Sequence, residues 1–181
     1  MVSILIDDDL LLRSWTAEDA PALFRAVDKN RTHLQPWLSW VERTTKPEHS
    51  ATFIQQTLAM AARGEAVHLG IFHQQHVIGA AGLHDCNAQV RSAAMGYWIA
   101  AGFEGQGIMQ RCLSRLVDFA FDTWGLQRLE LRCAGSNDRS RGIAHRLGFV
   151  EEGVLRRAHW REGTAEDLVV MGLLNEEWRS R

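Results

Sequence analysis

The sequence has 181 residues, a hydrophobic fraction of 46 %, a charged fraction of 23 % and a formal net charge of −2. These values are typical of one globular domain, and we expect residues 1–181 to form a single domain. The balanced charge argues against a general nucleic-acid-binding protein, and no apolar run is long enough to cross a membrane.

The cysteines and the first residues indicate a compartment. Three cysteines, at positions 86, 112 and 133, form an odd set without CxxC spacing, which favours a reduced protein over a disulfide framework. The opening MVSILIDDDLLLRSW has neither a basic start nor a long apolar core, so it does not resemble a signal peptide. We therefore expect a cytoplasmic protein.

Hydrophobic periodicity predicts the elements of the first half of the chain. They are a strand over 10–15, a helix after it, an irregular segment over 34–46, a helix over 47–63, and strands over 68–72 and 77–83. Thr16 and Asp19 have the spacing of a capping box at the start of the first helix. HQQH between the two later strands predicts a hairpin.

The second half predicts an alternation of strands and helices. It has a strand over 93–99, a helix over 107–124, a strand over 129–133, a helix from Ser136 or Asn137 to Gly148, and strands over 150–157 and 167–174. The order β-α-α-β-β-β-α-β-α-β-β predicts an α+β fold, with a mostly antiparallel sheet flanked by helices. One βαβ crossover, 93–133, brings two parallel strands together.

FEGQGIMQ (103–110) places two glycines between a predicted strand and a predicted helix. A helix N-terminus offers unpaired N–H groups and the positive end of the dipole, so this turn could hold a phosphate. It lacks the Lys-Ser/Thr of a P-loop, and Gln110 replaces the last glycine of a dinucleotide fingerprint. The alternative is an ordinary strand-to-helix turn.

The turn resembles the coenzyme A motif of the GNAT superfamily of N-acetyltransferases, Gln/Arg-x-x-Gly-x-Gly/Ala. Gly107 matches that motif, whereas Glu104 and Met109 depart from it. The wider chain, roughly 10–178, resembles the RimJ/RimL branch, whose members acetylate ribosomal-protein N-termini. The segments that carry this likeness are LQPWLSW (34–40), AAMGYWI (93–99), NDRSRGIAHRLGF (137–149) and the C-terminal stretch from Glu151.

The resemblance implies a GNAT-type fold and acetyl-CoA as a substrate, with no metal. It also implies direct transfer of acetyl to a primary amine, first of all the α-amino group of a protein N-terminus. The expected coenzyme contacts, mainly through the main chain, are Trp98, Ile99, Gly105, Gln106, Gly107, Ile108, Met109 and Asn137. A main-chain N–H near Ile99 is the expected oxyanion donor.

The same resemblance implies two catalytic side chains. Ser140 would protonate the departing thiolate, and His159, in AHW where relatives carry Ala-Glu-aromatic, would take the proton of the amine. The alternatives are that Asn137 and Ser140 only cap a helix, and that a surface His159 leaves the proton to water. Glu130 and His84 are lesser candidates for the base.

Two tryptophans and a cysteine have two interpretations each. Trp37 and Trp40 either pack their loop onto the sheet or wall the acceptor site, as the resemblance implies. Cys133 is expected to be a buried strand residue rather than a nucleophile.

Relatives of this kind are commonly dimers, so we expect a homodimer. We also expect the Glu104 side chain to face solvent or to cap neighbouring amides.

Two other functions stay open on the sequence. The acceptor could be a small amine, such as an aminoglycoside or a polyamine, if the acceptor pocket is strongly acidic. Alternatively, Glu104, Met109 and His159, which depart from the family pattern, could mark a catalytically silent regulatory module that binds coenzyme A.

Overall fold

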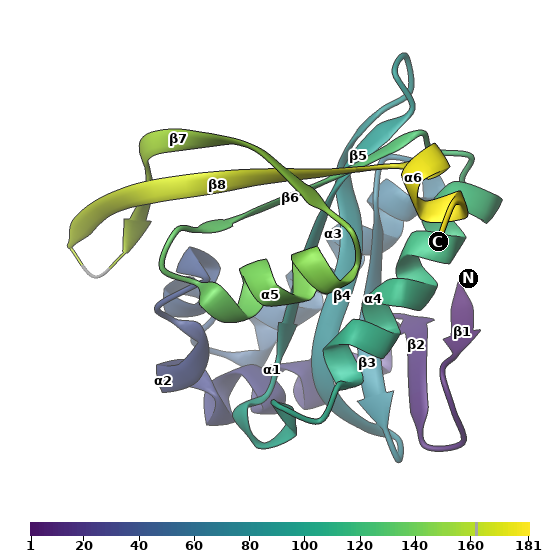
Figure 1. Cartoon of the computed structure of the whole chain (residues 1–181). Coiled ribbons are helices and arrows are strands. Elements are labelled where there is room, and N and C mark those ends of the chain that lie inside the picture. Colours follow the sequence, from purple (N-terminus) through teal and green to yellow (C-terminus); the bar gives the residue numbers. More distant parts are fainter. Residues whose placement is uncertain (162) are drawn as a thin grey trace.

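The computed structural model describes residues 1–161 and 163–181. Its centre is an eight-stranded sheet in the order β1-β2-β3-β4-β5-β6-β8-β7 (Figure 1). The strands are β1 (Ser3–Leu5), β2 (Leu10–Ser14), β3 (Val67–His73), β4 (His76–Asn87), β5 (Ser92–Ile99), β6 (Arg128–Ala134), β7 (Val150–Arg161) and β8 (Thr164–Leu174). Within the described residues, β5 and β6 are parallel and the other neighbours are antiparallel.

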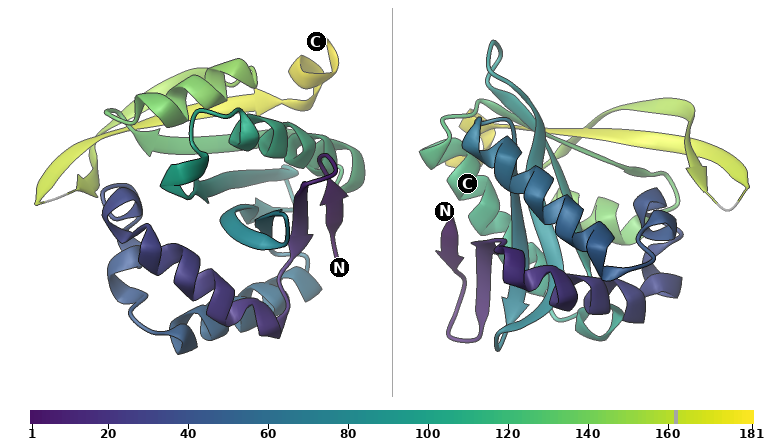
Figure 2. Two further views of the ribbon diagram at one scale, coloured as in Figure 1. Left: turned by 90° about the horizontal axis from the view of Figure 1, so that it is seen from below. Right: turned by 180° about the vertical axis from the view of Figure 1, so that it is seen from behind.

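Helices cover both faces of this sheet. They are α1 (Ala20–Lys29), α2 (Arg31–Leu34), α3 (Pro47–Ala62), α4 (Ile108–Asp118), α5 (Asp138–Arg146) and α6 (Asn175–Arg179). Helices α1 and α3 lie on one face, and α4 and α5 lie on the other (Figure 2). The predicted α+β fold with a mostly antiparallel sheet and one parallel crossover is therefore confirmed. No helix in the described chain is long and apolar enough to span a membrane.

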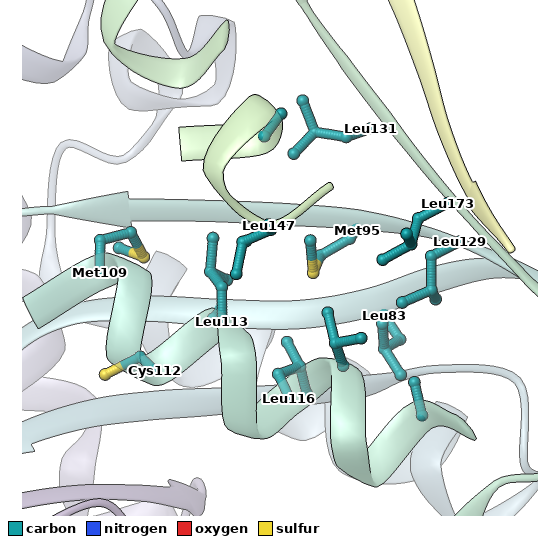
Figure 3. Close-up of a cluster of buried hydrophobic side chains, with 14 of the residues drawn as sticks. Leu83, Met95, Met109, Cys112, Leu113, Leu116, Leu129, Leu131, Leu147 and Leu173 are labelled. Carbon is teal, nitrogen blue, oxygen red and sulfur yellow. The ribbon is translucent and has the colours of Figure 1, made fainter. Parts of the chain in front are cut away.

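Each face of the sheet has its own apolar core. The first core packs α4 and α5 against the strands through side chains such as Leu83, Met95 and Leu116 (Figure 3). The second core, under α1 and α3, contains Trp15 and Phe72, whose ring centroids lie 5.8 Å apart. Burial on both faces explains why the central strands read as nearly continuous apolar runs.

Local signals in the sequence determine several boundaries. The capping box of Thr16 and Asp19 is present at the start of the 3-10 turn η1 (Ala17–Asp19) that leads into α1. Gln74 and Gln75 both have positive φ, 47° and 68°, as a tight two-residue hairpin turn requires. The predicted hairpin at 73–76 is thus confirmed.

Some elements differ from the sequence prediction. The segment 34–46 is not fully irregular, because it contains the end of α2 and the 3-10 turn η2 (Ser39–Arg43). The predicted helix 107–124 is α4 followed by a π turn (Phe119–Thr123). β7 and β8 extend beyond the predicted strands and form a long hairpin, and the short β1 and α6 were not predicted. These short terminal elements are too brief for a periodic pattern.

The site depends on how β5 and β6 separate. They pair at only three positions, from Ser92↔Arg128 to Ala94↔Glu130. Beyond these positions β5 stays paired with β4 as far as Ile99, while β6 stays paired with β8 as far as Ala134. The carboxyl ends of the two parallel strands therefore diverge and leave a gap in the sheet.

Candidate active site

A cavity of about 450 Å³ lies at the diverging ends of β5 and β6. Its size is in the usual range for a small-molecule site. Residues from six regions border it: α2 with the following loop, β5, the glycine turn, β6, α5 with the preceding loop, and the hairpin β7–β8. The segments that carry the resemblance to acetyltransferases therefore converge on one cavity.

The glycine turn presents unpaired main-chain donors at one end of this cavity. Gly105 and Gly107 have φ of 72° and 71°, the left-handed region that only glycine adopts readily. Gly107 is the N-cap of α4. No hydrogen bond is made within the described residues by the main-chain N–H groups from Gly105 to Met109. A Cβ at either glycine would meet open space, so a ligand could approach this backbone closely.

Glu104 differs from its predicted orientation. Its side chain is only 25 % exposed and borders the cavity, where it forms an ion pair with Arg139 of α5. Its other oxygen lies 3.5 Å from His33 Nε2 of α2. The expectation that Glu104 faces solvent or caps neighbouring amides is therefore wrong, because Arg139 and His33, which come from two different helices, hold its carboxylate at the cavity.

Ser140, Tyr97 and Asn137 form a hydrogen-bonded group on the cavity wall. Tyr97 Oη and Ser140 Oγ lie 2.8 Å apart, and Asn137 Oδ1 accepts a hydrogen bond of 3.0 Å from the Ser140 main-chain N–H. Asn137 is thus the N-cap of α5, while its amide group also borders the cavity. Burial raises the pKa of the Tyr97 hydroxyl to about 12, so it stays protonated and can donate to Ser140.

Cys133 lies beside this group, at the end of β6. Its side chain is buried and borders the cavity. Burial raises the pKa of the Cys133 thiol, which keeps it in the weakly nucleophilic protonated form at neutral pH. The predicted buried strand cysteine is confirmed.

The other end of the cavity meets the hairpin β7–β8. His159 of β7 borders it, and its partner in register on β8 is Glu166. Glu166 accepts a hydrogen bond of 2.6 Å from Ser136 Oγ and lies 2.8 Å from Arg161 Nε. The Arg161 guanidinium in turn lies 5.0 Å from the Trp37 ring centroid. These contacts join the hairpin to the loop after α2 and to the loop before α5.

The remaining predicted residues divide between cavity and core. Trp98, Ile99 and Met109 border the cavity, and the side chains of Trp98 and Met109 are buried, as expected for contacts through the main chain. The Gln106 side chain turns back to the Gly102 carbonyl, and the Ile108 side chain is in the core.

Of the two predicted acceptor tryptophans, Trp37 borders the cavity, whereas Trp40 packs against Trp98, with ring centroids 6.4 Å apart. Trp40 therefore packs its loop onto the sheet, which was one of its two interpretations from the sequence. The lesser base candidates have partners elsewhere: Glu130 pairs with Arg128 and Arg132, and His84 with Asp85.

Sequence analysis missed Tyr97 and Arg139 as residues that border the cavity, and Glu166 as the register partner of His159. Tyr97 lies in a strand next to a core tryptophan, so only the separation of β5 and β6 reveals its hydroxyl. Glu166 lies before the predicted start of the last strand, and its position opposite His159 follows from a bulged register that the sequence does not indicate. The lone tyrosine of the chain was the one available signal.

Three groups of residues thus meet at a split in a mixed sheet: free amides, a hydroxyl pair and a polar end beside the hairpin β7–β8. This fold and site define an acetyltransferase of the GNAT class. The family profile described as "Acetyltransferase (GNAT) domain" matches residues 9–150, and the chain belongs to this family. Among the described residues, no group of three His, Cys, Asp or Glu side chains could hold a metal ion.

Proteins similar to this chain include ribosomal-protein acetyltransferases. YdaF of Bacillus subtilis, provisionally named a ribosomal N-acetyltransferase, is 30 % identical over 98 % of both chains. The ribosomal-protein-serine acetyltransferase of Escherichia coli is 26 % identical over 92 % of this chain and 93 % of that protein. The solved structure of RimL, a ribosomal L7/L12 α-N-protein acetyltransferase holding coenzyme A through a cysteine disulfide, has 28 % identity and a TM-score of 0.92, covering 96 % of this chain and 98 % of that chain.

Proposed function

We propose that this protein transfers the acetyl group of acetyl-CoA to the N-terminal α-amino group of a protein of the ribosomal type. The observation that carries the proposal is the convergence of free amides of the glycine turn and the Tyr97–Ser140 pair on one cavity. Similarity to ribosomal-protein acetyltransferases over nearly the whole chain supports the acceptor class.

The coenzyme occupies the gap between β5 and β6 in this proposal. Its pyrophosphate accepts hydrogen bonds from the main-chain N–H groups of Gly105 to Met109. The pantetheine arm follows the main chain of Trp98 and Ile99 and meets the Asn137 amide, whose N–H groups are free because the cap uses its oxygen. The thiol end then lies near Cys133 and Ser140. The RimL structure with its coenzyme–cysteine disulfide supports a cysteine at this end.

The chemistry needs one proton acceptor and one proton donor. His159 Nε2 takes a proton from the acceptor ammonium, and the resulting amine attacks the thioester carbonyl carbon. A main-chain N–H near Ile99 stabilises the oxyanion. When the C–S bond breaks, Ser140 Oγ–H protonates the thiolate, and the second proton that the attacking nitrogen loses restores the serine hydroxyl. The proton held by His159 then passes to solvent. Tyr97, held protonated by burial, donates to Ser140 and keeps its hydroxyl hydrogen directed at the sulfur.

Charge in the cavity favours a protein N-terminus over a polyamine. The wall carries Glu104 and Asp138, but Arg132 and Arg139 balance them, and Glu104 is paired with Arg139. A polycation would gain little from this mixture. The strongly acidic pocket that would favour a small polyamine is not formed by the described residues.

The proposal includes a homodimer that forms along β7. This strand is the outer edge of the described sheet and exposes Val154, Leu155 and Trp160, the last with 69 % of its surface accessible. An exposed apolar edge strand is a liability unless another chain covers it. Light scattering of the wild type and of Trp160→Lys tests this part: a dimer that the substitution dissociates supports it, and a monomeric wild type contradicts it.

The enzymatic proposal is tested with acetyl-CoA and a panel of peptides that begin with serine, alanine or methionine. Release of free thiol is followed together with the peptide mass. Acetylation at the N-terminal amine supports the proposal. Coenzyme binding without thiol release for any peptide or small amine would favour the silent coenzyme-binding module.

A further inference from the structure

The starting point is an arginine at the cavity whose terminal nitrogens have no partner. Arg132 of β6 borders the cavity, and 54 % of its side chain is exposed. Its Nε donates a hydrogen bond of 2.7 Å to Glu130 Oε1. Neither of its two terminal nitrogens makes a hydrogen bond or an ion pair within the part of the chain that the structure describes. The planar end of this guanidinium is therefore available to a ligand.

Glu130 holds Arg132 in this position as part of a row of alternating charges. The Glu130 carboxylate also lies 3.2 Å from Arg128 Nη2, and Arg128 in turn donates hydrogen bonds to both carboxylate oxygens of Glu152. Gly172 leaves the space for that last pair, because a Cβ there would clash with both side chains. The row of charges therefore has its positive end, Arg132, at the cavity.

Arg132 and the proposed base His159 lie on the same face of the sheet. Residues paired across antiparallel strands project from one face, and so do residues two positions apart in a strand. Arg132 is paired with Val170 of β8. His159 is paired with Glu166, which lies four positions earlier in β8. Both pairs therefore share a face, and Leu168, between them in β8, also borders the cavity.

The proposed thiol end lies on the other face. Cys133 follows Arg132 in β6 and packs in the core under α4 and α5, so the Arg132 side chain points away from these helices. Gly96 lies two positions beyond Ala94 in β5, as Arg132 lies two beyond its partner Glu130 in β6. Since Gly96, Arg132 and Cys133 all border the same cavity, the cavity passes through the split in the sheet. An acceptor can thus reach the thioester from the Arg132 face.

From this placement we propose that Arg132 selects acceptors that carry a carboxylate side chain close to the N-terminal amine. The inference rests on the proposed acetyltransferase function and names a sequence preference of the same site. A guanidinium with both terminal nitrogens free can bind a carboxylate through two parallel hydrogen bonds. Arg139, the other arginine that borders the cavity, is paired with Glu104 instead.

The spacing along β8 limits where this carboxylate lies in the acceptor. The four residues between the level of His159 and that of Arg132 span about 13 Å in an extended strand. An extended peptide advances about 3.3–3.6 Å per residue. With the amine at His159, and with the arginine and the acidic side chain reaching toward each other, the carboxylate belongs to the second, third or fourth residue of the acceptor. A polyamine would instead place a further cation near Arg132.

The test uses serine-terminated peptides with an amidated C-terminus, in which one aspartate or asparagine stands at position 2, 3 or 4 and all other residues are neutral. We expect wild-type kcat/KM at the preferred position to be roughly fivefold or more higher for aspartate than for asparagine, mainly through KM. Arg132→Gln should reduce this ratio to about one. Arg128→Gln is the control, because Arg128 shares the strand and the Glu130 partner but does not border the cavity, and it should retain the preference.

Two further readouts separate a contact with the acceptor from a structural role. Arg132→Glu should reverse the preference, so that lysine at the same position is acetylated faster than aspartate, which a merely structural role would not produce. If Arg132→Glu does not fold beside Glu130, the aspartate and asparagine pair in Arg132→Gln still decides. The dissociation constant of coenzyme A should stay within about twofold of wild type in Arg132→Gln, because the coenzyme lies on the other face.

The failure of this inference differs from the failure of the proposed function. Equal kcat/KM for aspartate and asparagine at all three positions in the wild type would refute the role of Arg132 and leave N-terminal acetylation intact. Equal loss of the preference in Arg128→Gln and Arg132→Gln would also overturn it. If the wild type transfers acetyl to no peptide, the proposed function itself is refuted, and this inference with it.

Discussion

The hydroxyl groups of Tyr97 and Ser140 lie 2.8 Å apart and join β5 to α5 across the candidate active site. The two residues are 43 positions apart in the chain, so the crossover and the separation of β5 and β6 create the contact. In the proposed mechanism this serine, beside a buried phenol that stays protonated at neutral pH, is the proton donor for the leaving thiolate.

The first prediction concerns this pair. Ser140→Ala should lower kcat by roughly a hundredfold, because it removes the proton donor. Tyr97→Phe should lower kcat by about tenfold, because it removes only the hydrogen bond that positions the serine hydroxyl. Coenzyme affinity, measured by calorimetry, should change little in either variant. A wild-type kcat in Ser140→Ala would contradict this role and would mean that solvent protonates the thiolate.

The glycine turn gives a second prediction with a matched control. Gly107→Ala should weaken coenzyme binding, because the side chain strains a φ of 71° and occupies the open space before the amides. Gly64→Ala has the same kind of strain, at φ of 70° and also in open space, but it lies at the end of α3. Both variants should lose about 1 kcal/mol of stability, whereas only Gly107→Ala should bind the coenzyme less tightly.

Glu104 gives a third prediction. Its carboxylate lies at the cavity and neutralises Arg139, so Glu104→Gln should release Arg139 and remove a negative charge near the pyrophosphate. Coenzyme A should then bind roughly fivefold tighter, as expected for about 1 kcal/mol. Asp122→Asn is the control, because that carboxylate also pairs with an arginine, Arg179, but does not border the cavity. Weaker binding in Glu104→Gln would mean that the pair instead holds Arg139 in its binding position.

The fourth prediction concerns stability in acid. Burial, together with the nearby His84, lowers the pKa of His68 to about 4, so the folded protein keeps this imidazole neutral. The unfolded chain binds a proton there below about pH 6.5, which the folded protein does not. Stability should therefore fall as the pH drops from about 6.5 to about 4, by at most about 3 kcal/mol.

Denaturant titrations at several pH values check this effect. His68→Leu should flatten the dependence in that window, because the unfolded chain then gains no extra proton at this site. His76→Gln, at an exposed position of the hairpin turn, should leave the dependence as it is in the wild type. If the free energy of unfolding depends equally on pH in the wild type and in His68→Leu, the lowered pKa assigned to His68 is contradicted.

Cys133 provides a fifth prediction. If the coenzyme thiol lies at the end of β6, coenzyme A disulfide should form a mixed disulfide with Cys133, and acetyl-CoA should protect against it. The reaction should be slow at neutral pH and faster at alkaline pH, because burial raises the pKa of this thiol. Intact-mass measurement on the wild type and on Cys133→Ser checks it, and labelling that persists in Cys133→Ser would contradict this placement.

Much of the fold was predictable because local signals and tertiary structure agree. The capping box at Thr16, the HQQH turn and the left-handed Gly107 each determine a boundary from neighbouring residues alone. The possible phosphate site at the glycine turn came from the same kind of signal, whereas the coenzyme contacts expected there came from the family resemblance. Family resemblance supplied Asn137, Ser140 and His159, which border one cavity.

The side-chain orientations around the candidate site depend on long-range contacts that no local sequence pattern encodes. Whether Glu104 faces solvent or the cavity depends on Arg139 and His33, which come from two different helices. Trp37 and Trp40 are three residues apart, yet one meets the cavity and the other the core. Glu166 faces His159 only because of a register shift in β7.

The most direct test of the central claim is N-terminal acetylation by the wild-type protein. A serine-terminated peptide and the same peptide with a blocked N-terminus but a free lysine are incubated with acetyl-CoA, and product masses are measured. We predict that one acetyl group is added to the free N-terminus and none to the blocked peptide. Acetylation of the lysine alone, or of neither peptide, would contradict the account.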